Sequence, residues 1–272
     1  MGKTVTARVI DGINPRLGRF LRQWRDERTI TRPIKTRYGF SLSGPPVLFR
    51  ENWEFDELSL FEKLLSDTDV CVDIGANAGY YTCLGASRGK HVLAVEPMAG
   101  NLKFLYNNLR INDLTDNVEV YPLGFSTTPS LLRIYGRSDV ASFVKGWQQQ
   151  DGHYDLVPTV DMDLVVGNRF SGKKLLIKLD VEGYELNVLR GAQVTLALQP
   201  RPTWIVEAFV TAPETTMSLA DNFRTIFETF WSLGYKSQSI GSSLVDVTPK
   251  DVDAWVKKGE ADGPSNYLFS AV

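Results

Sequence analysis

The stretch "VCVDIGANAGYY", Val70 to Tyr81, decides the fold of this chain. Its β-prone residues lead into Asp73, and a turn with glycines at positions 75 and 79 follows. A glycine-rich turn between a strand and a helix often holds a nucleotide, because glycines let the backbone pass close under a ligand. The sequence therefore predicts a nucleotide-type site, with a carboxylate at its mouth.

Strand and helix patterns alternate around this turn. Apolar strand patterns are found at 91–96, 118–125, 174–180 and 202–209, helical patterns at 51–67, 99–112, 184–199 and 218–234, and the last strands in "YKSQSI", "SSLVDV" and "NYLFSAV". This alternation indicates an α/β fold with a doubly wound, mostly parallel sheet. In such sheets, ligands bind beyond the carboxyl ends of the central strands.

The charge is distributed unevenly along the 272 residues. Residues 1–40 carry a net charge of +7 and the remainder carries −9. We expect a basic N-terminal arm over 1–48, with a helical pattern at 16–28, followed by one α/β domain over 49–272. The arm has two open interpretations: it contacts an anionic partner (lipid headgroups, an acidic glycan or nucleic acid), or it covers the acidic body of its own chain or of a twin subunit in a homodimer.

Several classes of protein are disfavoured by composition. Cys71 and Cys83 make neither a disulfide framework nor a zinc site, and no apolar run is long enough to span a membrane. The N-terminus has no apolar signal core, so we expect a cytoplasmic protein. Because the body is acidic and lacks a basic, aromatic-rich face, we expect no nucleic-acid partner.

The glycine turn discriminates between nucleotide types. No Gly-Lys-Ser/Thr triplet occurs, which disfavours a P-loop, and the Gly-x-x-x-Gly spacing does not match a dinucleotide site. Asp73 would also repel the phosphates of a dinucleotide. S-adenosylmethionine has no phosphate and carries an ammonium and a sulfonium, which a carboxylate attracts. Glu96 ends the next strand, where an acid can accept hydrogen bonds from two ribose hydroxyls.

Four segments resemble the FkbM-type S-adenosylmethionine-dependent methyltransferases. They are "VDIGANAGYYT", "VEPMAGNLKFLYNNLRIN", "LIKLDVEGYELNVLRGA" and "WIVEAF". The resemblance implies a class I methyltransferase fold, with a Rossmann-like sheet of seven strands whose last strand is antiparallel. It also implies O-methylation of hydroxyls on saccharides or natural products.

The resemblance implies roles for individual residues. It places Asp73, Gly75, Ala76, Asn77 and Gly79 in the cofactor turn, Glu96 and Pro97 at the ribose, Glu54 near the methionine ammonium, Ser142 near adenine, and Asp180, Glu182 and Glu185 in an acidic motif after the fourth strand. The resemblance does not extend to the basic arm, and it does not identify the methyl acceptor.

Acidic residues at the strand ends are the candidates for catalysis. Asp180, Glu182 and Glu207 could bind the acceptor hydroxyl or act as general base, although capping or internal pairing is the competing interpretation. Lys178 shares a strand face with Asp180, and we expect it to pair with Asp180 or Glu207 because an isolated buried charge is costly. No metal ligand set is predicted, although these acids offer oxygens suited to Mg²⁺ or Ca²⁺.

Three questions remain open at the level of sequence. The chain could methylate a nitrogen or a carboxylate instead of a hydroxyl, or it could be a non-catalytic S-adenosylmethionine-binding module that docks through its arm. We expect the acceptor to be a small molecule or a glycan. The candidates for a sugar-stacking face are Trp24, Trp147, Tyr154 and Phe209.

Overall fold

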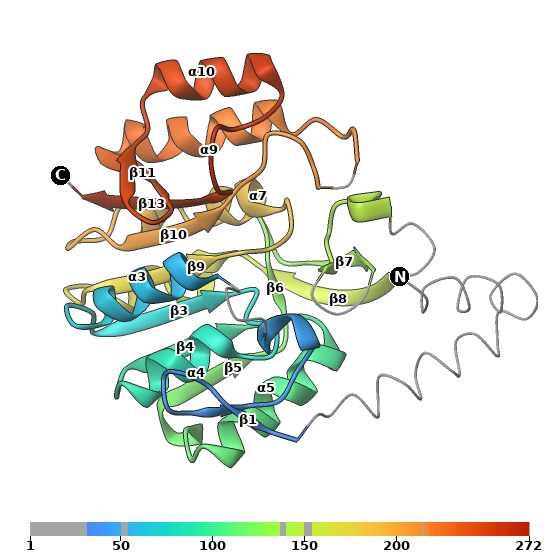
Figure 1. The fold of residues 1–272 in the computed structure, drawn as a ribbon, viewed down its shortest axis with the longest axis vertical. Helices are drawn as coiled ribbons and strands as arrows, with labels where there is room; N and C mark the ends of the chain where they lie inside the picture. The colour runs from blue at the N-terminus through green and yellow to red at the C-terminus, as the bar shows by residue number, and fades with distance from the viewer. Residues whose placement is uncertain (1–31, 50–53, 137–139, 150–153, 214, 272) are drawn as a thin grey trace, which may run out of the picture.

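The computed structural model describes residues 32–49, 54–136, 140–149, 154–213 and 215–271, and it shows a sheet between two layers of helices (Figure 1). The strands are β1 (Ile34–Lys35), β2 (Ser41–Leu42), β3 (Val70–Ile74), β4 (His91–Val95), β5 (Val118–Tyr121), β6 (Gly124–Phe125), β7 (Ser130–Tyr135), β8 (Tyr154–Val160), β9 (Leu175–Leu179), β10 (Thr203–Glu207), β11 (Tyr235–Ile240), β12 (Leu244–Asp246) and β13 (Asn266–Ala271). The α-helices are α3 (Phe55–Leu65), α4 (Tyr80–Ser87), α5 (Ala99–Ile111), α6 (Met162–Val165), α7 (Glu185–Arg190), α8 (Gln193–Leu196), α9 (Ala220–Ser232) and α10 (Pro249–Lys258). Short 3-10 helices are η1 (Pro46–Phe49), η2 (Thr115–Asn117), η4 (Trp147–Gln149) and η5 (Gly167–Phe170).

The main sheet has the order β12-β11-β13-β10-β9-β3-β4-β5. Its five strands from β10 to β5 are parallel, and β13 runs antiparallel between β10 and β11. The predicted doubly wound sheet with an antiparallel last strand is therefore confirmed. The sheet differs from the seven strands expected in one respect, because β12 adds a short hairpin strand at its edge.

Side-chain alternation along the strands explains the two helical layers. In β3, Val70, Val72 and Ile74 pack into the core beneath α7, α8 and α9, whereas Cys71 packs into the core beneath α3, α4 and α5. Because helices cover both faces, the central strands are apolar almost throughout. Lys178 in β9 and Asp73 in β3 are buried charged exceptions, and Lys178 lies on the side of the sheet that α3 covers, where it contacts Glu57.

Two helical predictions need correction. The single helix expected over 184–199 is wrong, because the segment forms α7 and α8 with a break at Gly191 and Ala192. A side chain at Gly191 would collide with the carbonyl oxygen of Ser126, so the break lies where the chain packs tightly. The helix α10 was missed, although Thr248 and Asp251 form the reciprocal capping box that begins it.

Part of the expected N-terminal arm packs on the domain. Asn108 of α5 accepts hydrogen bonds from the backbone N–H and hydroxyl of Ser43, both at 2.8 Å, and its amide donates to the carbonyl oxygen of Ala78. This contact connects the segment before α3 to the glycine turn. The predicted helix of the arm and most of its basic residues lie outside the described residues, whereas Arg32, Lys35 and Arg37 lie within them. Across the described part of the chain, no helix has the length and apolar character needed to cross a membrane.

Candidate active site

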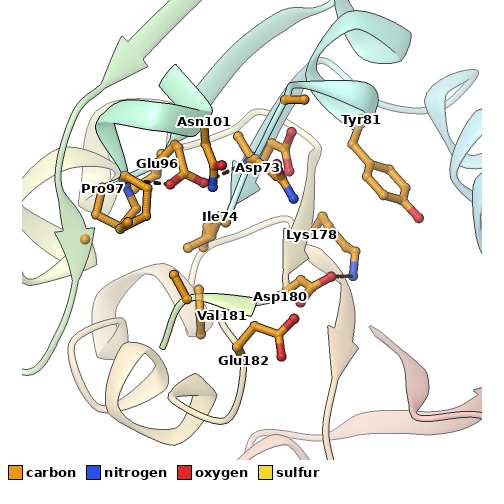
Figure 2. A pocket seen from close by; sticks show the side chains of 18 of the residues that line it. Asp73, Ile74, Tyr81, Glu96, Pro97, Asn101, Lys178, Asp180, Val181 and Glu182 are labelled. Carbon is orange, nitrogen blue, oxygen red and sulfur yellow. Dashed lines mark hydrogen bonds and ion pairs between the residues drawn. The ribbon is translucent and has the colours of Figure 1, made fainter. Parts of the chain in front are cut away.

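A cleft opens at the carboxyl ends of β3, β4, β9 and β10 (Figure 2). The predicted site residues that line it are Glu54, Asp73, Gly75, Ala76, Asn77, Glu96, Pro97, Asp180, Glu182 and Glu207. In Figure 2, Glu96 and Asn101 lie on one side, and Lys178, Asp180 and Glu182 lie across from them. The topology thus brings together residues that are far apart in sequence.

Each of the two glycines of the turn is required by a positive φ and by a different close contact. Gly75 has a φ of 85°, and a side chain there would collide with the carbonyl oxygen of Asp180. Gly79 has a φ of 86° at the start of α4, where a side chain would collide with Leu105 of α5. Gly75 therefore sets the turn against the loop after β9. Gly79 serves helix packing and does not line the cleft.

Glu96 is held in place by backbone amides. Its two carboxylate oxygens accept hydrogen bonds from the N–H groups of Asn77 (2.8 Å) and Met98 (2.7 Å). Burial raises the pKa of Glu96 to about 7, and these bonds and the Asn101 side chain oppose the rise. Sequence reasoning missed Asn101, although it shares a buried helix face with Leu105. The arrangement leaves lone pairs of a fixed carboxylate for ligand hydroxyls.

Asp73 is a second fixed carboxylate at the base of the cleft. The hydroxyl of Thr82 donates to its Oδ2 at 2.5 Å, and the residue is 2% exposed. Burial raises the pKa of Asp73 to about 6, whereas the Thr82 hydrogen bond and the charge of Lys178 lower it. A cation that enters the cleft would favour the ionised form.

The buried ammonium of Lys178 joins two carboxylates. It lies 3.1 Å from Oδ2 of Asp180 and 3.0 Å from Oε1 of Glu57. The predicted pairing with Asp180 is confirmed, and Glu57 of α3 is a second partner that sequence reasoning missed. Glu57 precedes Phe61 by four residues and so lies on the apolar helix face, which is the pattern that could have revealed it. Burial lowers the pKa of Lys178, but the carboxylates outweigh it and hold the pKa well above its usual value.

Asp180, Glu182 and Glu207 form an acidic group, and one oxygen from each lies within 4.8 Å of the others. Burial raises the pKa of Glu207 well above its usual value, and the charge of Asp180 raises it further. Glu182 has a φ of 54°, and its Oε2 accepts a 2.6 Å hydrogen bond from the indole N–H of Trp147. Carboxylates this close can share a proton or accept one from a ligand.

Ser142 and Trp147 support the loop after β9 that carries Asp180 and Glu182, which we call the acidic loop. The Ser142 hydroxyl donates to the carbonyl oxygen of Glu182 at 2.6 Å, and Ser142 does not line the cleft, although Ala141 and Phe143 do. Trp147 is wholly buried, so its expected place in a sugar-stacking face is wrong. Phe209 packs against it with ring centroids 5.8 Å apart, and Tyr154 is half exposed but does not line the cleft. Trp24 lies outside the described residues.

The buried acids predict how stability depends on pH. Burial raises the pKa values of Asp73 to about 6, Glu96 and Glu185 to about 7, and Glu54 to about 8. The folded protein therefore binds more protons than the unfolded chain between about pH 4.5 and 8, and stability falls as pH rises through this window. We expect the melting temperature of the ligand-free protein at pH 5.5 to exceed that at pH 8 by at least about 2–4 °C.

Calorimetric scans at both pH values measure this difference. The Glu96→Gln variant is the matched control, because it removes one titrating group and should reduce the difference. Arg169 lowers the pKa of Glu119 to about 2, so that group loses its stabilising effect only below about pH 4.5. A melting temperature that rises from pH 5.5 to 8 would contradict the prediction.

Comparisons with known proteins place the chain in a family. Residues 73–237, more than half of the chain, match the model of the methyltransferase FkbM domain. No curated protein matched in sequence. Among solved structures, the methyltransferase FkbM of Methylobacillus flagellatus KT is 20% identical, with a TM-score of 0.44, and the alignment covers 75% of this chain and 44% of that one.

Two further solved structures show similar values. The precorrin-6y C5,15-methyltransferase of Geobacter metallireducens GS-15 is 12% identical with a TM-score of 0.43, and 84% of this chain and 91% of that chain are covered. The human methyltransferase 10 domain containing protein is 14% identical with a TM-score of 0.43, and 87% and 90% are covered. The assignment rests on the match in sequence to the domain, and this chain is a methyltransferase that belongs to the FkbM family.

Proposed function

We propose that this chain is an S-adenosylmethionine-dependent O-methyltransferase that acts on a hydroxyl of a saccharide or natural product. The observation that carries the proposal is the charge of the cleft. Its described lining has one ammonium, that of Lys178, and six carboxyl groups, those of Glu54, Asp73, Glu96, Asp180, Glu182 and Glu207. Such a site attracts a cation and repels phosphates, as the donor requires.

The residues present fit S-adenosylmethionine. Asn77 carries a buried Oδ1 without a hydrogen-bond partner in the described structure, and Gly75 lets the turn approach the carbonyl oxygen of Asp180, another residue of the cleft wall. Glu96 would accept from the ribose hydroxyls, and Asp73 and Glu54 would face the charged methionine end. When bound, the donor supplies an activated methyl group on its sulfonium.

The chain must then align the acceptor and remove its proton. Asp180 and Glu207 lie beside each other at the ends of neighbouring strands, and the raised pKa of Glu207 makes its carboxylate a stronger base. We therefore propose that the carboxylate of Glu207 is the general base that accepts the proton of the acceptor hydroxyl. Alignment of the nucleophile within a dry cleft can supply several kcal/mol, up to about 7–11 in ideal cases.

The acceptor class and the setting belong to the same proposal. A polyhydroxyl acceptor could bind to the acidic group of Asp180, Glu182 and Glu207, because vicinal hydroxyls donate hydrogen bonds to carboxylates. The acidic body supports a small-molecule or glycan acceptor over nucleic acid, and the two buried free cysteines accord with a cytoplasmic setting. Contact of the basic arm with an anionic partner or a twin subunit involves residues outside the described part.

The test begins with calorimetry and continues with turnover. S-adenosylmethionine and S-adenosylhomocysteine are titrated first, and then saccharides, natural-product alcohols, amines and carboxylic acids are screened for release of S-adenosylhomocysteine. Binding followed by turnover with an alcohol supports the proposal, whereas turnover confined to amines or acids would reassign the acceptor. Absence of binding at millimolar donor would overturn the enzyme assignment, and turnover unchanged by chelator would exclude a required metal.

Asp73→Asn is expected to weaken the binding of S-adenosylmethionine by about 10–150-fold, the value of a charge-assisted hydrogen bond in a buried site. The amide keeps the shape of the carboxylate and removes its charge, so the loss reports the attraction of the cation. Asp116→Asn on the exposed helix η2 is the control and should bind as the unaltered protein does. Equal affinities of all three proteins would contradict the role of Asp73.

A further inference from the structure

The hydroxyl of Tyr81 makes two short contacts that one proton cannot satisfy. Its oxygen lies 2.5 Å from Oε2 of Glu54 and 2.7 Å from Oε1 of Glu57. A phenol has one proton to donate and lone pairs to accept with. If both carboxyl groups were ionised, one of these contacts would join two acceptors in a buried site. One of the two carboxyl groups must therefore carry a proton.

The neighbouring charges decide which carboxyl group is protonated. Oε1 of Glu57 lies 3.0 Å from the ammonium of Lys178, and Glu57 is 3% exposed, so its ionised form is the one that is paired. No ion pair joins Glu54 to a described cation. Tyr81 thus donates to Glu57, and Glu54 donates to Tyr81. Burial raises the pKa of Glu54 to about 8, the charge of Glu57 raises it further, and the charge of Lys178 and the contact with Tyr81 oppose the rise.

We infer that Glu57 is a positioning residue that, through Tyr81, keeps a proton on Glu54 in the free cleft, and that a cationic ligand bound at Glu54 expels this proton to solvent. The inference rests on the proposed binding of S-adenosylmethionine, whose ammonium is the cation. The Oε2 atom of Glu57 has no hydrogen-bond partner among the described residues, so the proton is not shared through that atom.

Every titratable group around Glu54 bears on this coupling. Among the described residues, the groups are Glu57 on α3, Tyr80 and Tyr81 on α4, Lys178 on β9 and Asp180 after it, across the cleft Asp73, Glu182 and Glu207, and Arg37 before α3. Asp180 and Glu57 already pair with Lys178, and the exposed guanidinium of Arg37 stacks on the Phe55 ring, 4.4 Å from its centroid. An incoming ammonium is therefore the charge that can stabilise ionised Glu54. Affinity should rise with pH up to about 8 and fall in more acidic solution.

Calorimetry in buffers of different ionisation enthalpy tests the inference. The probe is S-adenosylhomocysteine, which carries the ammonium without the sulfonium, and pH 6.5 keeps that ammonium protonated because α-amino groups titrate near pH 8. We expect binding to release about one proton more from the unaltered protein than from Glu54→Gln. Glu57→Gln should bind the probe and release fewer protons than the unaltered protein, since Glu54 then replaces Glu57 as a partner of Lys178.

The outcomes separate this inference from the proposed function. If the probe does not bind, the proposed donor is wrong. If it binds and Glu54→Gln releases as many protons as the unaltered protein, the proton is not on Glu54 and the inference fails. Thermal melting confirms that each variant is folded, and Tyr81→Phe, which removes the shared hydroxyl, gives a second measurement if Glu57→Gln does not fold. Unchanged proton release by a folded Tyr81→Phe would also overturn the role of this network.

Discussion

Replacing Lys178 by methionine is expected to lower the free energy of unfolding by about 3–5 kcal/mol. The ammonium lies within 3.1 Å of carboxylate oxygens of both Glu57 and Asp180, and its side chain is 2% exposed. Methionine fills a similar volume, so the loss measures the charges left unpaired and not a cavity. Denaturant unfolding at pH 7 gives the change.

Two comparisons make this result specific. Lys174 pairs with Asp67 on the surface, and Lys174→Met should change stability by no more than about 0.5 kcal/mol. Adding Glu57→Gln to Lys178→Met should restore part of the loss, because one unpaired carboxylate is removed with it. A Lys178→Met protein as stable as the Lys174→Met control would show that the buried network is not the source of stability.

The sheet was predictable because its strands repeat a simple physical requirement. Strands covered on both faces are apolar almost throughout, and "VCVDI" and "LLIKL" each carry a single charged residue in an otherwise apolar run. The periodicity of the sequence failed to predict the structure where packing between distant segments determines it. The break between α7 and α8 depends on the approach of Gly191 to Ser126, some 65 residues earlier in the chain, and no local periodicity reports such a contact.

The site was predictable to the extent that its residues end strands. Asp73, Glu96, Asp180 and Glu207 all belong to or follow parallel strands, so their convergence follows from topology. Glu57 comes from a helix outside the repeating pattern, and its role depends on the position of α3 over β9. The resemblance placed Ser142 near adenine, but its hydroxyl donates to Glu182, because the excursion after β7 folds back on the acidic loop.

Glu207→Gln is expected to reduce kcat by about 10²–10⁴-fold, the usual contribution of a general base. The variant uses the alcohol that turns over fastest in the acceptor screen, and KM for S-adenosylmethionine should change little. Burial and Asp180 raise the pKa of Glu207, so kcat of the unaltered enzyme at saturating S-adenosylmethionine should fall as pH falls and Glu207 becomes protonated. The glutamine variant should lose this dependence, because no base remains to titrate.

Glu182→Gln distinguishes proton transfer from support of the loop. The carboxylate of Glu182 is already held by the indole N–H of Trp147, whereas that of Glu207 accepts from the Ser265 hydroxyl at 3.1 Å and lies beside Asp180. Loss of the Trp147 hydrogen bond disturbs the loop, so Glu182→Gln should raise KM for the acceptor more than it lowers kcat. If Glu182→Gln instead abolishes the pH dependence and Glu207→Gln retains it, Glu182 is the base and Glu207 is part of the charge network around Lys178.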